Sequence, residues 1–362
     1  MDRFQVFLAM KTRPVSCTPI LSGSVPHYNE TTDCSANPCV RERIGPLPEH
    51  TDERSGHVPA FADPRPDYRR TAGTERAVAS VRPPRPGSDR AAGSGVAMSY
   101  KPPDRRGTME LTEFAERLDD RLDVEDLEGL DYAVNGLQVG PEDATVDRAA
   151  FAVDGVELTF ETAAEWGADV LVVHHGVSWG GIDRVTGKSY DRLAALLGND
   201  LALYAVHLPL DAHPDLGNAA GLADFLDLEV VGGFGREGPA TVGVRARAAE
   251  SRTVDGLCDR LADLPNDRVD VLDFGPDRIE DVAVLTGSGT DWLDEAREEG
   301  VDALITGEGK QPAYHEAREA GVNVFLAGHY ATETFGVQSL RTVVEAWDEG
   351  VETTYIEHPT GL

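Results

Sequence analysis

The same unit, a helix followed by a glycine turn and a buried strand, occurs twice in this sequence, 133 residues apart. AAEWGADVLVVHHG spans residues 163–176, and AREEGVDALITGEG spans residues 296–309. A related segment, EAGVNVFLAGHY, matches the second copy at an offset of 21 residues. This repetition predicts two related α/β lobes, although helix-glycine-strand units also resemble one another in unrelated proteins.

Strand and helix patterns alternate along residues 109–362. The expected strands are short apolar runs, at 149–153, 168–174, 201–207, 241–247, 269–274, 281–287, 301–307, 323–329 and 353–358. The expected helices are longer and amphipathic, at 156–166, 190–198, 217–227, 252–263, 290–299, 311–320 and 331–347. This order is typical of an α/β fold. We expect two lobes, about 109–230 and 231–362, with mostly parallel mixed sheets and a site at the strand C-terminal ends between them.

Residues 1–108 differ in composition from the rest of the chain. They are rich in Pro, Gly, Ser, Thr and Arg, as in RPPRPGSDRAAGSG, and show neither helical nor strand periodicity. Such a segment is expected to be a disordered extension, because it cannot bury enough apolar surface. The favoured explanation is that translation starts at Met109 and that the upstream residues are a misassigned start, and the alternative is a genuine flexible extension.

Acidic residues dominate the second part of the chain. Residues 109–362 contain 17 of the 33 Lys and Arg residues and 52 of the 64 Asp and Glu residues, a net charge of −35. These acids lie between patterned apolar positions, which indicates a solvated surface more than a site for a basic partner. The composition resembles that of proteins from extreme halophiles, and it disfavours nucleic acid as a partner.

Apolar runs are too short to cross a membrane. The longest ones fall well below the roughly 20 residues that a spanning helix needs. The first residues also lack the long apolar region and the small-residue cleavage site of a signal peptide. We therefore expect a cytoplasmic protein that has no membrane partner.

Histidines gather at the ends of three expected strands. Five of the seven histidines in residues 109–362 lie there, together with two carboxylates, and the set is His174, His175, His207, Asp211, His213, His329 and Glu333. Ligands of open α/β sheets bind at the carboxyl ends of the strands, so we expect these side chains to converge. Imidazole and carboxylate ligands suit zinc, iron or manganese, and a carboxylate such as Glu333 can bridge two ions about 3.5–4 Å apart. Only Cys258 lies in this part of the chain, so thiolates do not supply the site.

Three residues and one segment have alternative interpretations. A role for His207 and His213 in hydrogen bonding to ligands or in shaping turns is favoured over direct metal ligation. Glu308 matches His175 in the repeat, and it either supports a ligand or acts as a catalytic general base. TGSGTDW, residues 286–292, could hold a phosphate, but a plain tight turn is favoured because no Walker lysine follows.

Five motifs, in this order, resemble the YbgI-type dinuclear-metal family of GTP cyclohydrolase 1 type 2 homologues. They are NGLQVG, GADVLVVHHG, LYAVHLPLDAHPDLGN, DALITGE and AGHYATETFG, and the resemblance spans essentially residues 109–362. The short link from 231 to 280 resembles the compact form of the family, without its inserted domain. The sequence departs at Tyr330, where a second histidine often follows, and at Val177 and Ser178, where an aromatic residue often follows HHG. These departures bear on the pocket wall and on substrate choice.

The resemblance implies a ligand set and an assembly. One of His174 and His175 would bind each metal, Asp211 and His329 would bind one metal each, and Glu333 would bridge both. The family forms a toroidal homo-hexamer whose metal sites face an internal cavity.

Two classes of function are consistent with these features. The first is a metal-dependent hydrolase that activates water and acts on a small-molecule substrate. The family label points to opening of the guanine imidazole ring of GTP, which receives little weight because the sequence has no nucleotide fingerprint. The alternative is a non-catalytic metal handler, either an insertase or chaperone that passes metal on or a regulatory scaffold locked by metal.

Overall fold

The computed structural model describes residues 39–41 and 109–362, apart from positions 128 and 142. The chain divides into two compact units, Met1–Asn37 and Pro38–Leu362. The first unit lies outside the described residues, and everything below concerns the second.

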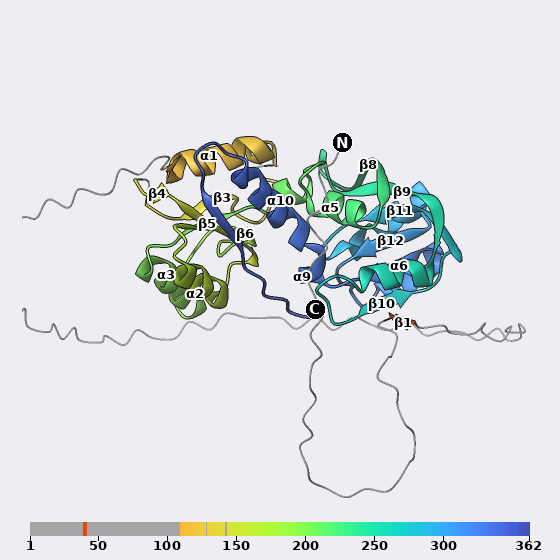
Figure 1. Cartoon of the computed structure of the whole chain (residues 1–362). Coiled ribbons are helices and arrows are strands. Elements are labelled where there is room, and N and C mark those ends of the chain that lie inside the picture. Colours follow the sequence, from red (N-terminus) through yellow and green to blue (C-terminus); the bar gives the residue numbers. More distant parts are fainter. Residues whose placement is uncertain (1–38, 42–108, 128, 142) are drawn as a thin grey trace, which may run out of the picture. The chain divides into compact units, whose positions relative to one another are not determined.

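The first sheet has five strands and is covered by helices on both faces (Figure 1). Its order is β14 (Glu352–Tyr355), β5 (Arg148–Asp154), β6 (Val170–His175), β7 (Ala202–Ala205) and β3 (Gly136–Val139). The first four strands are parallel, and β3 pairs antiparallel with β7 at the edge. Phe151 belongs to the core cluster on one face, whereas Ala150 and Ala152 belong to the cluster on the other. Burial on both faces explains why β5 is apolar at consecutive positions.

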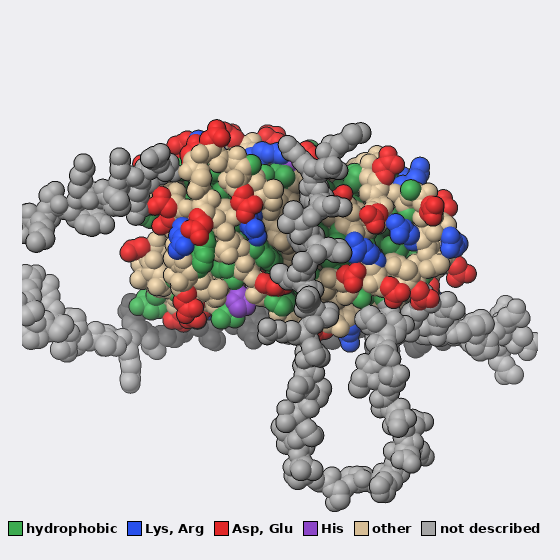
Figure 2. Space-filling model, viewed as in Figure 1, with side chains coloured by type: hydrophobic (Ala, Val, Ile, Leu, Met, Phe, Trp, Pro, Cys, Tyr) green, Lys and Arg blue, Asp and Glu red, His purple; other side chains and the backbone are tan. Residues whose placement is uncertain are grey.

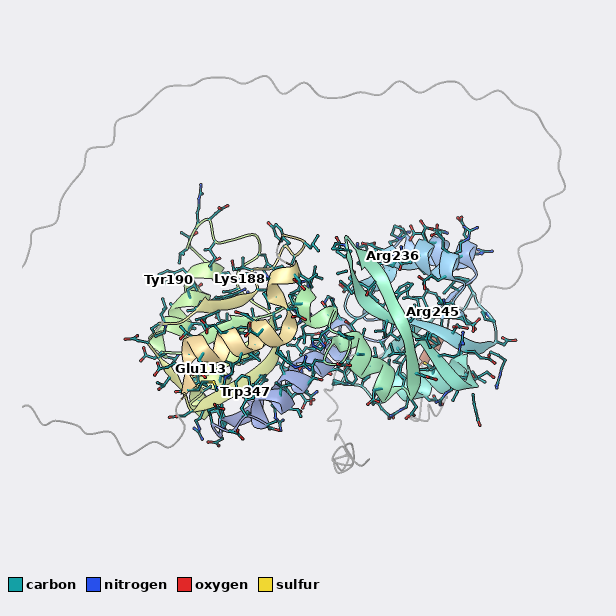
Figure 3. The ribbon with its side chains drawn as sticks, turned by 90° about the horizontal axis from the view of Figure 1, so that it is seen from above. Glu113, Lys188, Tyr190, Arg236, Arg245 and Trp347 are labelled. Carbon is teal, nitrogen blue, oxygen red and sulfur yellow. The ribbon has the colours of Figure 1, made fainter. Side chains whose placement is uncertain are left out.

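Four helices enclose this sheet, namely α1 (Leu111–Leu122), α2 (Glu157–Trp166), α3 (Lys188–Gly198) and α10 (Thr334–Glu345). Residues of α1 and α10 contribute to one core cluster, and residues of α2 and α3 contribute to the other. Figure 3 labels Trp347 just beyond α10, where Phe114 of α1 packs edge-on against its ring with centroids 5.3 Å apart. A short antiparallel pair, β2 (Met109–Glu110) and β4 (Thr145–Val146), lies next to α1.

The second sheet contains seven strands. Its order is β1 (Cys39–Arg41), β10 (Val269–Leu272), β13 (Asn323–Leu326), β12 (Ala303–Thr306), β11 (Arg278–Val284), β9 (Ala240–Thr253) and β8 (Leu228–Glu237). The central strands β11, β12 and β13 are parallel, and their flanking neighbours β9 and β10 are antiparallel to them. The helices of this lobe are α5 (Asn218–Phe225), α6 (Val254–Leu261), α7 (Leu293–Glu299) and α8 (Ala313–Ala320). The expected α/β architecture with mixed sheets is thereby confirmed.

The internal repeat is visible in the hydrogen bonds of the two sheets. Asp169 accepts bonds from the backbone amides of residues 147 and 148, at 2.8 and 2.9 Å. Asp302 does the same for residues 280 and 281, at 2.8 and 3.0 Å. In both copies a left-handed glycine, Gly167 or Gly300, ends the preceding helix. Each of these positions differs from its counterpart by 133, so the sequence repeat corresponds to a structural one.

The C-terminal segment returns to the first sheet, which differs from the expected division into 109–230 and 231–362. Strand β14 pairs with β5, and the apolar residues Val337, Leu340 and Val344 of α10 are buried in the core of the first lobe. Apart from β1, the strands of the second sheet thus come from the segment between β8 and β13. The sequence interpretation also missed β3 and β8. Each contains glycine, and most of β8 is exposed, so neither has a continuous apolar run.

Strand β1 pairs in parallel with β10, from Cys39 opposite Val269 to Arg41 opposite Val271. This pairing differs from the disorder expected for residues 1–108, and it satisfies the free edge of β10. The remainder of that segment lies outside the described residues. Cys258 in α6 is fully buried and disulfide-bonded, which the sequence interpretation did not anticipate.

Acidic side chains outnumber basic ones on the face of the molecule shown in Figure 2. Figure 2 shows Asp and Glu side chains spread over the face in view, with fewer Lys and Arg between them. Among the described residues, no helix has the length and apolar character needed to cross a membrane.

Candidate metal centre

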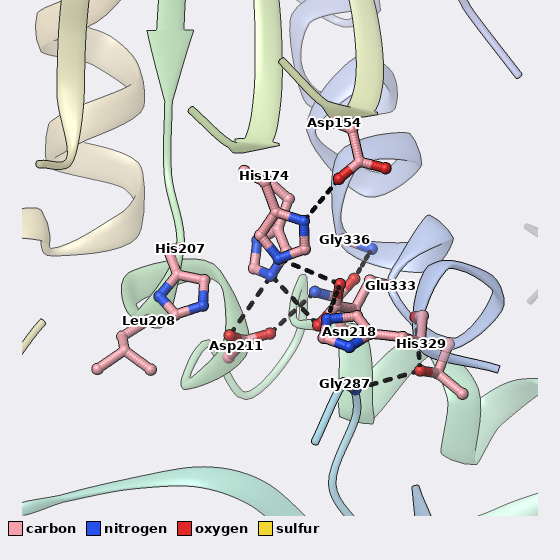
Figure 4. A network of polar contacts seen from close by, with 12 residues as sticks. Asp154, His174, His207, Leu208, Asp211, Asn218, Gly287, His329, Glu333 and Gly336 are labelled. Carbon is pink, nitrogen blue, oxygen red and sulfur yellow. Dashed lines mark hydrogen bonds and ion pairs between the residues drawn. The ribbon is translucent and has the colours of Figure 1, made fainter. Parts of the chain in front are cut away.

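Three loops at strand ends carry the candidate ligands (Figure 4). His174 and His175 end β6, Asp211 ends the short helix α4 (Leu208–Asp211) after β7, and His329 begins α9 (His329–Thr332) after β13. Glu333 is the break between α9 and α10, with φ −103° and ψ 9°. The helix expected over 331–347 is therefore two helices, and the break places the carboxylate at their junction.

The turn after β6 brings both neighbouring histidines to one side. Their ring centroids are 4.6 Å apart, although adjacent strand residues normally point to opposite faces. A Cβ at Gly176 would lie 2.4 Å from Oε1 of Gln138, so only glycine allows this approach. That Gln138 oxygen accepts hydrogen bonds from the amides of Val177 and Ser178 at 2.8 and 3.2 Å. The NGLQVG motif thus holds the loop that follows the histidines.

Glu333 lies between the three candidate histidine ligands. Its Oε1 is 3.7 Å from Nε2 of His174, whereas its Oε2 is 3.3 Å from Nε2 of His175 and 3.2 Å from Nε2 of His329. On the other side, Nε2 of His174 is 3.6 Å from Oδ2 of Asp211. The structure therefore brings together all five residues that the sequence nominated as ligands.

Two buried atoms in this cluster have no hydrogen-bond partner among the described residues. They are Nε2 of His174 and Oε2 of Glu333, and the side chains are 0% and 5% exposed. Buried polar groups are normally paired, because leaving one unpaired costs about 1–3 kcal/mol. An imidazole nitrogen and a carboxylate oxygen are both ligands that suit a divalent cation. The donor set therefore fits a metal centre.

Charge in the cluster is shared between carboxylate and imidazole. Burial would lower the pKa of His174, but Asp211 and Glu333 more than offset that effect and raise the pKa to about 10. Burial opposes ionisation of Glu333, yet the surrounding histidines hold its pKa well below the usual range. In the metal-free protein, the shifts favour a protonated His174 next to an ionised Glu333.

Nδ1 of each of the three candidate histidine ligands has a hydrogen-bonding partner outside the ligand set. Nδ1 of His175 lies 2.9 Å from Asp154, Nδ1 of His329 lies 3.0 Å from Glu308, and Nδ1 of His174 lies 2.9 Å from the carbonyl of Val206. These acceptors favour a proton on Nδ1, which leaves the Nε2 lone pair facing the cluster. Glu308 thus positions His329 in this geometry. This is the supporting role, one of the two roles that the sequence allowed for Glu308; the other was that of a general base.

The carboxylate of Asp211 is fixed from the second lobe. Nδ2 of Asn218, at the start of α5, donates to Oδ1 of Asp211 at 2.9 Å. Oδ1 of Asn218 accepts a bond from the amide of Gly336 at 2.7 Å, and Asn218 is fully buried. This single amide connects the Asp211 loop to α10, only three residues after Glu333.

His207 lies at the edge of the cluster. Its Nδ1 is 3.0 Å from Asp131, and its backbone amide donates to Asn135 at 2.7 Å. One ring nitrogen of His207 also lies within 4.8 Å of ligand atoms of His174 and His175. The structure accordingly combines the favoured turn-shaping role with a position that faces the site. A second group, His175, His329 and Glu333, shares His175 with the first. Its ligand atoms also lie within 4.8 Å of one another.

His213 does not join the cluster. Its Nε2 lies 2.7 Å from Arg121, and its Nδ1 accepts bonds from the amides of Asp215 and Leu216. Burial and the guanidinium of Arg121 lower the pKa of His213. These contacts agree with the turn-shaping role that the sequence favoured.

Gly287 is a component of the site that the sequence interpretation missed. It adopts φ +63°, and a Cβ there would lie 2.4 Å from Oε1 of Glu333 and 3.3 Å from Nε2 of His329. Its amide donates to Thr332, and its carbonyl accepts a bond from the amide of Glu308 at 2.8 Å. The TGSGTDW segment is therefore a tight turn against the candidate metal centre, and its last four residues form the short 3₁₀ helix η2 (Gly289–Trp292).

Fold and site together define an α/β protein with two related lobes and a histidine-carboxylate cluster that could hold metal. Residues 109–360 match the model of the Duf34/NIF3 (NGG1p interacting factor 3) family, and the chain belongs to that family.

Relatives and solved structures agree with this assignment. A Halobacterium salinarum protein named GTP cyclohydrolase 1 type 2 homolog is 56% identical over 257 residues, covering 70% of this chain and 100% of the relative. The solved structure of protein ybgI has a TM-score of 0.65 and 34% identity, covering 70% of this chain and 100% of its own. A structure from Thermus thermophilus has a TM-score of 0.64 and 37% identity, with the same two coverages. The expected YbgI-type resemblance is confirmed.

Proposed function

We propose that this protein binds two divalent ions and uses them to hydrolyse a small-molecule substrate. His174, Asp211 and Glu333 would hold one ion, and His175, His329 and Glu333 would hold the other. The observation that supports this most is the buried Glu333 carboxylate, whose two oxygens face different histidines. Zinc, iron and manganese all suit such ligands.

A bound pair of ions would supply Lewis acidity, lowering the pKa of water and stabilising the negative charge that develops on the substrate. The chain's own residues have the task of orientation. Asp154 and Glu308 hold His175 and His329, and Asn218 holds Asp211. Gly287 leaves space beside Glu333 that any side chain would fill. Each of these contacts limits the movement of a ligand before substrate arrives.

The substrate and assembly belong to the same proposal. Relatives carry the name GTP cyclohydrolase 1 type 2 homolog, which makes a purine nucleotide the first compound to test. We also propose a homo-hexamer in the cytoplasm, without nucleic acid or membrane partners. The competing function is a metal insertase, chaperone or metal-locked scaffold, which needs the same ligands but no reaction.

Metal analysis combined with an activity screen tests the proposal. Purified full-length protein should contain divalent metal and hydrolyse at least one nucleotide or phosphoester, whereas Glu333→Ala should lose both metal and activity. Metal-loaded protein that transfers its ions to an acceptor protein, but hydrolyses nothing in the screen, would favour the metal-handling function instead.

A further inference from the structure

A pocket lies beside the candidate metal centre, and Trp179 borders both. The pocket encloses about 480 Å³ of space, part of which opens to solvent, and its wall includes Val177, Trp179, Ile182, Lys188, Arg192 and Leu193. The Trp179 ring lies 5.1 Å from the ring of His207 and 6.0 Å from the ring of His175, between centroids. A molecule in the pocket would therefore reach the candidate ligands past the indole.

Trp179 is held in place but remains accessible. It forms an isolated β-bridge with Ala133, and the neighbouring Gly180 donates its amide to the carbonyl of Tyr132 at 2.6 Å. The residue is nevertheless 39% exposed. A fixed, half-open indole offers a flat surface on which a planar ring can stack.

Two cations line the same pocket. Lys188 begins α3 and Arg192 follows one turn later, and Figure 3 labels Lys188 beside Tyr190 on this helix. Within the described part of the chain, neither cation has an ion-pair or side-chain hydrogen-bond partner, and the nearby acids Asp183 and Asp191 do not line the pocket. Lys310, the other lysine of residues 109–362, is paired with Asp291.

These two cations stand out against the charge of the protein. Residues 109–362 carry a net charge of −35, and Lys188 and Arg192 are two basic side chains next to each other on one wall of the pocket. Cations that line a pocket without acidic partners attract an anionic group of a ligand. Apolar residues on the same wall, such as Val177 and Leu193, provide contact for an uncharged ring.

We propose that this pocket selects the substrate, by stacking a planar ring on Trp179 and binding an anionic group, phosphate or carboxylate, at Lys188 and Arg192. The inference rests on the proposed function, because the reactive atom of that substrate would face the histidine cluster. It assigns Val177, one of the positions where the sequence departs from its family, to the wall that contacts the ring.

Calorimetric titration of the metal-loaded full chain tests this assignment with three probes at one fixed salt concentration. GMP combines ring and phosphate, guanosine lacks the phosphate, and indole-3-acetate replaces phosphate with carboxylate. GMP should bind about 10-fold tighter than guanosine or better, since hydrogen bonds to charged groups contribute about 1.5–3 kcal/mol. Binding of indole-3-acetate that is lost when Lys188 and Arg192 are replaced would show that a carboxylate on a planar ring is also accepted.

Variants assign the effect to residues. Lys188→Gln with Arg192→Gln should abolish the preference for GMP over guanosine, and Trp179→Ala should weaken both probes while Trp179→Phe retains most binding. Arg184→Gln removes an exposed cation of the same loop that does not line the pocket, so it should leave the preference unchanged. The proposal is overturned if none of the probes binds, or if the double variant behaves like Arg184→Gln.

Metal content, measured in every variant, separates this inference from the proposed function. The pocket variants should keep the metal content of the unmodified protein. If the unmodified chain contains no metal yet still prefers GMP in a manner that depends on Lys188 and Arg192, the pocket assignment stands and the metal-centre proposal fails.

Discussion

Oε2 of Glu333 lies 3.3 Å from Nε2 of His175, although Glu333 joins α9 to α10 and His175 ends β6. The same oxygen is 3.2 Å from Nε2 of His329, and it has no hydrogen-bond partner among the described residues. A buried carboxylate surrounded by imidazole is costly to maintain unless a cation or proton neutralises it.

Replacing Gly287 with alanine should damage the metal centre. The added Cβ would lie 2.4 Å from Oε1 of Glu333, and φ +63° is itself unfavourable for alanine. We expect at least a 10-fold loss of metal affinity, measured by chelator competition. Gly300→Ala is the matched control, because Gly300 has φ +68° with no atom within 4 Å of its Cβ. It should lower stability by about 1 kcal/mol but keep metal affinity. Equal metal affinity in the two variants would contradict this account of Gly287.

Removing the Asp154 carboxylate should loosen His175. Asp154→Ala deletes the group 2.9 Å from Nδ1 of His175, and loss of such an orienting acceptor typically lowers metal affinity about 10–100-fold. Chelator competition measures the loss. Glu161→Ala, which removes an exposed carboxylate from α2 of the same lobe, should have no effect. An Asp154 variant that matches the Glu161 variant would show that the bond does not position the ligand.

Metal affinity should keep rising with pH well beyond the ordinary range for histidine. Burial would lower the pKa of His329 in the metal-free protein, but Glu333 and Glu308 raise it from 6.5 to about 9. The protonated form therefore stabilises the metal-free fold fully below about pH 6.5, and this contribution is lost as pH rises through about 9. Metal must displace that proton, so chelator competition should show affinity increasing from about pH 6.5 to 9. An affinity that levels off near pH 6.5 would be inconsistent with this charge arrangement.

Salt should stabilise the acidic body of the protein. With −35 on residues 109–362, self-repulsion grows as the Debye length increases from about 3 Å in molar salt to about 10 Å at 0.1 M. The thermal midpoint should therefore fall when KCl is lowered from molar to millimolar concentration. Sucrose at matched water activity serves as the control for non-ionic effects. An unchanged midpoint would argue against the halophilic character expected from composition.

The sequence could predict the ligand cluster because its members are tied to strand ends. His174 and His175 are the last residues of the apolar strand β6, His329 follows the apolar strand β13 by three residues, and Glu333 lies one helical turn after His329. The carboxyl ends of parallel strands meet at one edge, so local patterns were sufficient to bring these residues together. The repeated helix-glycine-strand unit likewise predicted both lobes, because each copy is a local pattern that can be recognised in the sequence.

Residues that act across the fold could not be found in this way. Asp154 supports His175 through strand pairing, and Gly287 makes room for Glu333 from a loop 46 residues earlier in the chain. Such roles depend on three-dimensional proximity that periodicity does not encode. The sequence did not predict that β14 pairs with β5 in the first sheet. The partner of β14 depends on where the preceding helix α10 packs, and the residues of β14 do not encode that position.

Metal stoichiometry in two carboxylate variants tests the central claim most directly. Elemental analysis should find two divalent ions per chain in the unmodified protein. Asp211→Asn should keep one of them, because His174 is the candidate histidine ligand that Asp211 approaches, whereas Glu333→Gln should weaken both, because its oxygens face all three histidines. A Glu333→Gln protein that retains two ions at the affinity of the unmodified protein would contradict the dinuclear centre.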